Sequence, residues 1–271
     1  MITSLCSKLM KMTIGAFAFM TAVCCSCSSA NHSSSGVIGR GRSDAFILSD
    51  DLTEKEVMDN LEKLGNIFSE MVENHQTYNG WWKNIPLGKE AFSLMKDGLP
   101  LRVKGELTPY TRIVLLDKMM GTMPEKDCAR TFLEVKTYQM SMFALVSDGD
   151  IDEDMDIDGY EGDAGKYVRA VTIDDVRKSL RRTEDYLDPK MSMEEWCDKY
   201  DVTLKFDPVE RSEKWENCIY EVESECDRKL RNEHKGMGFC YSYWSTKKAV
   251  LAKHGIEWKS PAVMNPRVMF D

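Results

Sequence analysis

The sequence predicts a mainly helical protein with a minor β component, in which about seven helices make up the folded body. Three observations support this prediction. Apolar residues recur at spacings of three and four along most of the chain beyond residue 44. Ser or Thr stands three residues before an acidic residue at several expected helix starts. Only two short stretches alternate apolar and polar residues as a strand does. An α+β fold stays open as the alternative.

The first half of the body is expected to hold four helices. Thr53 and Glu56 form a capping box before an apolar stripe. Thr108 caps another helix whose first residue is Pro109, a position where the missing N–H is harmless. The four expected helices cover residues 53–75, 89–96, 108–121 and 125–146.

The second half is expected to mix helices with two strands. Residues 167–171 and 202–206 are the candidate strands. Thr172 with Asp175 and Ser192 with Glu195 are further capping boxes. The helices expected here cover residues 172–186, a short segment from 192, then 211–234 and 241–254.

The N-terminus has the pattern of an export signal. Lys8 and Lys11 supply a positive start, and residues 12–23 form an uncharged, mostly apolar run. This run is too short to span a bilayer, which needs about 20 apolar residues. We therefore expect an exported protein.

The end of this signal resembles that of bacterial lipoproteins. Cys24, Cys25 and Cys27 follow the apolar run, and the resemblance covers residues 1–27 only. It implies that one of these cysteines is acylated and anchors the mature protein to the membrane of the cell envelope. Ordinary cleavage after Ala30, which would release a soluble periplasmic or secreted protein, is the alternative.

The chain divides into three parts by composition. Residues 1–24 are the expected signal peptide, and residues 25–43 form a Ser- and Gly-rich tether that cannot bury enough apolar surface to fold. Residues 44–271 form the mostly helical body, with a subdivision expected at the acidic segment 147–165.

The charge of the chain argues against one class of partner. The net charge is −9, and because residues 1–23 contain two lysines and no acid, their removal leaves −11. Nucleic-acid binding needs a basic surface, so we expect no nucleic-acid partner. The body contains an odd number of cysteines, which leaves the disulfide pattern open: Cys128, Cys197, Cys218, Cys226 and Cys240.

The acidic segment weakly resembles the calcium loop of EF-hand proteins. Nine acidic residues fall within 148–163, and alternating carboxylates are the ligands that Ca²⁺ prefers. A loop starting at Asp154 has the required Gly159 but lacks the final Glu, whereas one starting at Asp150 ends on Glu161 but lacks the glycine. The candidate Ca²⁺ ligands are Asp150, Asp152, Asp154, Asp156, Asp158 and Glu161. A solvated acidic loop is the alternative.

No catalytic motif stands out, and no catalytic residue is predicted. The adjacent Trp81 and Trp82 are the candidate ligand-binding residues, because two neighbouring indoles in a loop are hard to bury together. The leading hypothesis is a non-enzymatic envelope lipoprotein that binds another protein or a surface ligand. The alternatives are a calcium-binding module and an extracytoplasmic hydrolase whose site the sequence does not reveal.

Overall fold

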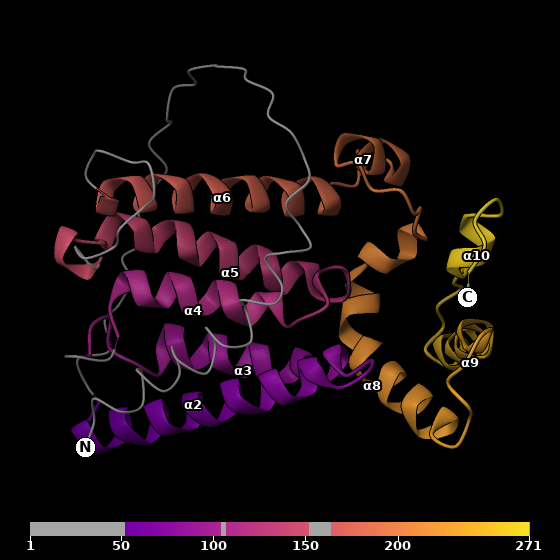
Figure 1. Ribbon diagram of the computed structural model, residues 1–271, viewed down its shortest axis with the longest axis horizontal. Helices are drawn as coiled ribbons and strands as arrows, with labels where there is room; N and C mark the ends of the chain where they lie inside the picture. The colour runs from indigo at the N-terminus through magenta and orange to yellow at the C-terminus, as the bar shows by residue number, and fades with distance from the viewer. Residues whose placement is uncertain (1–51, 104–106, 152–163, 271) are drawn as a thin grey trace.

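The computed structural model describes residues 52–103, 107–151 and 164–270, and this part of the chain contains nine α-helices. Five of them lie one above the next with roughly parallel axes (Figure 1). These five are α2 (Glu54–Gln76), α3 (Asn84–Asp97), α4 (Pro109–Gly121), α5 (Ala129–Met142) and α6 (Ala164–Leu187). The prediction of a mainly helical body is confirmed.

The remaining helices lie at one end of this stack (Figure 1). They are α7 (Met193–Lys199), α8 (Glu213–Leu230), α9 (Phe239–Lys253) and α10 (Pro261–Met264). Helix α8 contacts α9 and, within the stack, helix α5. It also contacts the short 3-10 helices η2 (Trp81–Lys83) and η3 (Glu125–Cys128). No helix in the described ranges is both long and apolar enough to cross a membrane.

The helix starts follow local chemistry. The capping boxes at Thr53 and Ser192 form as the sequence predicts, with reciprocal side-chain and backbone hydrogen bonds. Thr108 also caps α4, with Thr111 completing the box and Pro109 in the first turn. Helix α3 begins at Asn84, five residues earlier than expected, because Pro86 lies in its first turn, where a missing N–H costs no helical bond.

Both predicted strands are wrong. Residues 167–171 lie inside α6, where packing against α5 overrides the weak strand preference of the segment. Thr172 therefore does not start a helix, and its side chain instead hydrogen-bonds the phenol of Tyr110.

Residues 202–206 form a loop whose backbone has no strand partner in the described ranges. The amide of Asn265 takes the place of such a partner, accepting from the N–H of Lys205 and donating to its C=O, each at 2.9 Å. In this part of the chain the only β-type pairing is one isolated bridge between Val103 and Leu107. The body is all-α.

The core runs through the stack into α8. Helix α8 contributes an apolar stripe at helical spacing, and every member of it is buried: Trp215, Ile219, Val222, Cys226 and Leu230. A smaller cluster joins the end of α6 to α7 around Trp196. All five cysteines of the body are free thiols, and each except Cys240 is buried.

Two charged side chains inside the body hydrogen-bond the backbone groups that helix ends leave unpaired. Arg112 is fully buried and donates to the carbonyl of Met95 in the last turn of α3 and to those of Leu99, Pro100 and Leu101 just after it. Glu216 of α8 caps α5, because its carboxylate accepts from the N–H groups of Arg130 at 3.0 Å and Thr131 at 3.1 Å. Cys128, the residue at the cap position, offers no side-chain cap of its own.

Candidate functional site

A pocket of about 580 Å³ lies at the junction between the helix stack and the α8–α9 pair. Four segments far apart in sequence form it. They are residues 75–82, which include the end of α2 and η2, then the start of η3, helix α8 and helix α9. The volume lies within the range of about 300–1,000 Å³ that is typical of small-molecule sites.

The turn between α2 and η2 positions Trp81 and Trp82, which form the aromatic side of the pocket. Asn79 adopts a left-handed conformation with φ of 56°, which its short polar side chain tolerates. Gly80 is required by close approach, because a Cβ atom there would lie 2.2 Å from the carbonyl oxygen of Asn74. This tight reversal directs Trp81 and Trp82 to different environments.

The two candidate tryptophans both line the pocket, but they differ in exposure. Trp81 is 43% exposed and its ring lies 4.7 Å from that of His75. Trp82 is only 8% exposed and its ring packs 5.5 Å from Tyr220 of α8. Trp81 therefore offers an accessible aromatic face, whereas Trp82 chiefly fixes η2 against α8.

His75 supports that aromatic wall. Its side chain hydrogen-bonds the backbone of Thr122, while its Nδ1 atom is buried and has no hydrogen-bond partner. Burial lowers its pKa. The imidazole of His75 lies against the indole of Trp81 with the two ring planes inclined by 43°, and it supports the indole from behind.

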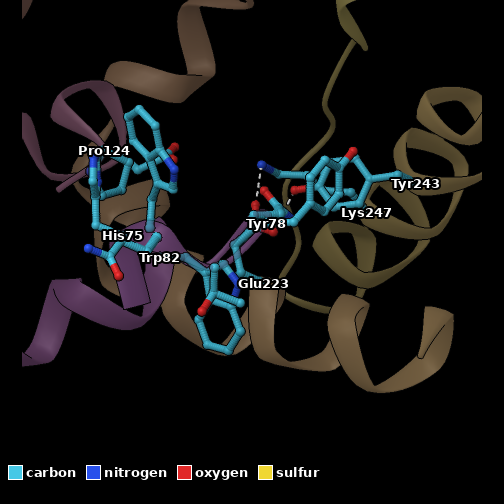
Figure 2. A pocket seen from close by; sticks show the side chains of 12 residues that line it. His75, Tyr78, Trp82, Pro124, Glu223, Tyr243 and Lys247 are labelled. Atoms are coloured by element: carbon cyan, nitrogen blue, oxygen red, sulfur yellow. Dashed lines mark hydrogen bonds and ion pairs between the residues drawn. The ribbon is translucent and has the colours of Figure 1, made fainter. Parts of the chain in front are cut away.

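The opposite side of the pocket is an ion-paired cluster, shown in Figure 2. Lys247 of α9 donates to Glu223 of α8 at 2.6 Å, and the Tyr243 hydroxyl donates to the other oxygen of the same carboxylate. Glu223 and Lys247 are 4% and 8% exposed. The pair is thus largely removed from water, although both side chains contribute to the pocket lining.

Aromatic rings surround the ammonium of Lys247. Its Nζ atom lies 4.9 Å from the ring centroid of Trp215, 5.6 Å from that of Trp258 and 5.8 Å from that of Tyr243. Burial disfavours its charge, but Tyr243, Glu223 and Asp127 outweigh burial and raise its pKa. Lys247 therefore stays protonated, so it is a fixed cation and not a nucleophilic amine.

Two further acids lie close to this cation. Asp127 of η3 accepts from the indole N–H of Trp215 at 2.8 Å, and Glu210 accepts from that of Trp258 at 2.8 Å. Burial raises the pKa of Asp127, and it raises the pKa of Glu210 to about 7, although Lys247 acts in the opposite direction on both. Burial in this cluster therefore makes both acids harder to ionise than they are in water.

No pattern in the sequence predicts this cluster. Its members come from η3, η6 (Pro208–Arg211), α8 and α9, and no spacing along the chain connects them. One signal was present: Glu223 follows Val222 directly, within the apolar stripe of α8. A charged residue that is itself buried needs an internal partner, which for Glu223 is Lys247.

The candidate calcium ligands lie almost entirely outside the described residues. Asp150 is the exception, and its carboxylate pairs with Arg102 and accepts from the N–H of Ser147. These interactions lower its pKa. Within the described ranges, no group of three or more His, Cys, Asp or Glu is placed to hold a metal ion. Calcium binding by 150–161 stays a prediction, as does acylation of Cys24, Cys25 or Cys27.

A second hollow of about 450 Å³ lies against α3, α5 and α8. The carboxylate that reaches furthest into the protein there, Glu216, is already used as the cap of α5. Comparison of the chain with protein-family models, curated proteins and solved structures finds no match.

Proposed function

We propose that this chain is an exported binding protein, held to the cell envelope by an N-terminal lipid, whose helical body captures a small ligand in the pocket between Trp81 and Lys247. The observation that carries the proposal is the construction of the pocket. One wall is an accessible indole backed by His75, and the other is an ion pair that is already satisfied inside the protein. Such a pocket offers recognition surfaces without a free reactive group.

The N-terminal signal supports the location in this proposal. The Ser- and Gly-rich composition of residues 25–43 is typical of a segment that joins a lipid anchor to a folded body. A body on such a tether would sample ligands near the membrane surface.

The experiment is a titration of the mature protein with a panel of candidate ligands, followed by tryptophan fluorescence. The panel holds neutral and acidic oligosaccharides, short peptides, nucleosides and small amines. We expect one class to change the emission with saturation, and Trp81→Ala to weaken that response at least tenfold. A panel in which no class binds, or binding that Trp81→Ala leaves unchanged, would overturn the proposal.

One observation favours a hydrolase as the second candidate. The pocket contains two carboxylates, Asp127 and Glu223, and burial raises the pKa of the first while Lys247 pairs with the second. Glycoside hydrolases use two carboxyl groups, of which the one with the raised pKa serves as the general acid. Product analysis after long incubation with the bound ligand distinguishes a hydrolase from a binding protein. Turnover that Asp127→Asn abolishes would support the hydrolase. An unchanged ligand would exclude hydrolysis of that ligand.

A further inference from the structure

We propose that the ligand class of this pocket is a neutral saccharide, whose ring stacks on Trp81 and whose hydroxyls reach the polar residues around it. This inference rests on the proposed binding function. It is carried by the geometry of the aromatic wall, the polar groups at the rim, and the internal pairing of the charges.

The aromatic wall suits a flat ligand with an apolar face. Trp81 is 43% exposed, and the His75 ring at 4.7 Å backs it. Tyr78, at the same rim, is 71% exposed and carries the ammonium of Lys235 over its ring at 5.4 Å. The C–H face of a pyranose carries a slight positive charge, which the negative face of an indole or phenol attracts.

The polar rim suits hydroxyl groups. Gln76 and Asn79 line the pocket on the same turn as Trp81, and both side chains are exposed. An amide presents a donor and an acceptor side by side, and a sugar hydroxyl both donates and accepts. Two neighbouring hydroxyls of a ring can therefore pair with one amide, which a ligand with only donors or only acceptors cannot do.

The charges of the pocket disfavour ionic ligands. Lys247 is held by Glu223 at 2.6 Å and surrounded by three aromatic rings, so it is not available to an anionic group. An anion would also face the carboxylates of Glu223 and Asp127. A cation would have to displace Lys247 from a buried carboxylate, which leaves a buried charge without its partner. A neutral ligand avoids both penalties.

The side of the pocket that holds the ion pair can still bind a hydroxyl group of the ligand. Tyr243 and Glu223 line it together, and a carboxylate accepts about four hydrogen bonds, of which Lys247 and Tyr243 use two. Glu223 therefore keeps acceptor capacity for a ligand hydroxyl while its charge stays neutralised. The ligand then spans from the indole of Trp81 to this carboxylate.

The test uses isothermal titration calorimetry on the whole mature protein. The probes are neutral oligosaccharides of β-1,4-, α-1,4- and β-1,3-linked glucose, xylose and N-acetylglucosamine, an oligogalacturonate as the acidic arm, tripeptides, and nucleosides. We expect at least one neutral oligosaccharide to bind, with Trp81→Ala weakening it at least tenfold and Gln76→Ala by a few-fold. Trp81→Phe should retain most of the affinity, because it keeps an aromatic face.

Tyr241→Ala is the matched control. Tyr241 is 51% exposed and belongs to α9, but it packs on Trp244 and does not line the pocket. Its variant should bind as the unaltered protein does. Circular dichroism of each variant shows whether it is folded.

The outcomes separate this inference from the function on which it rests. Binding of an acidic saccharide, a peptide or a nucleoside in place of a neutral saccharide, with loss in Trp81→Ala, overturns the inference and leaves the binding function standing. Binding of no probe overturns both. Binding of a neutral saccharide that Trp81→Ala and Tyr241→Ala affect equally overturns the assignment of the sugar to this pocket.

Discussion

The first stability prediction concerns the buried ion pair between Lys247 and Glu223, which lies beside the pocket. Lys247→Met replaces the buried ammonium with a thioether of similar volume, so the contacts with Trp215 and Trp258 are largely kept. What is lost is the only cation that the structure places against Glu223 in the described ranges. Removing one partner of a buried ion pair costs about 3–5 kcal/mol, because the other charge stays buried without compensation.

The magnitude follows from how little water reaches the pair. Glu223 and Lys247 are 4% and 8% exposed, so solvent does not replace the lost partner. A domain of this size has about 5–15 kcal/mol of total stability, so the variant should lose a large fraction of it. Adding Glu223→Gln to the variant removes the uncompensated charge and should recover part of the loss, with a coupling of about 1–3 kcal/mol.

The assay is equilibrium unfolding in urea followed by far-UV circular dichroism, since the fluorescence of Trp215 and Trp258 would itself respond to the substitution. Lys248→Met is the matched control, because this neighbouring lysine is exposed and should change stability by less than about 0.5 kcal/mol. A loss below about 1 kcal/mol in Lys247→Met, or strict additivity in the double variant, would refute the reasoning.

Four further predictions concern other parts of the chain. Glu216→Ala should lower the free energy of unfolding by about 3 kcal/mol in the same assay, because two N–H groups at the start of α5 lose their acceptor. Between pH 4.5 and about 7 stability should fall as pH rises, because the folded protein keeps a proton on Glu210 that the unfolded chain releases; Glu210→Gln should flatten the fall, and an unchanged slope would contradict the assignment. Iodoacetamide should label Cys240 in the native body and the four buried cysteines only after unfolding, as peptide mass mapping would show. Mass spectrometry of the mature N-terminus should find a diacylglyceryl cysteine, whereas a chain starting at Asn31 would exclude the anchor.

Much of the helical structure was predictable because helix starts are decided locally. Thr53, Thr108 and Ser192 cap their helices through hydrogen bonds that span only three residues. The stripe of α8 was equally readable, since helical periodicity places its members on one face. The two strand predictions were wrong because a strand, unlike a helix start, is not decided locally. A strand needs a partner to pair with, and the chain supplies none to 167–171 or 202–206 in the described ranges.

The candidate site was only half predictable. Trp81 and Trp82 stood out as adjacent indoles, and both line the pocket, but their unequal exposure depends on the turn at Gly80 and on α8. Nothing in the sequence connects Asp127, Glu223 and Lys247, because each belongs to a different element.

The sequence by itself therefore determined most of the helices and the acidic charge, and it predicts an export signal, because these depend on neighbouring residues or on composition. The tertiary structure alone decided which charges meet. It brought Lys247 of α9 to Glu223 of α8, and it set the end of α2 across from them. The physical reason is burial: a charge inside a core must find a partner wherever the packing places one, and packing joins residues that lie far apart in the chain.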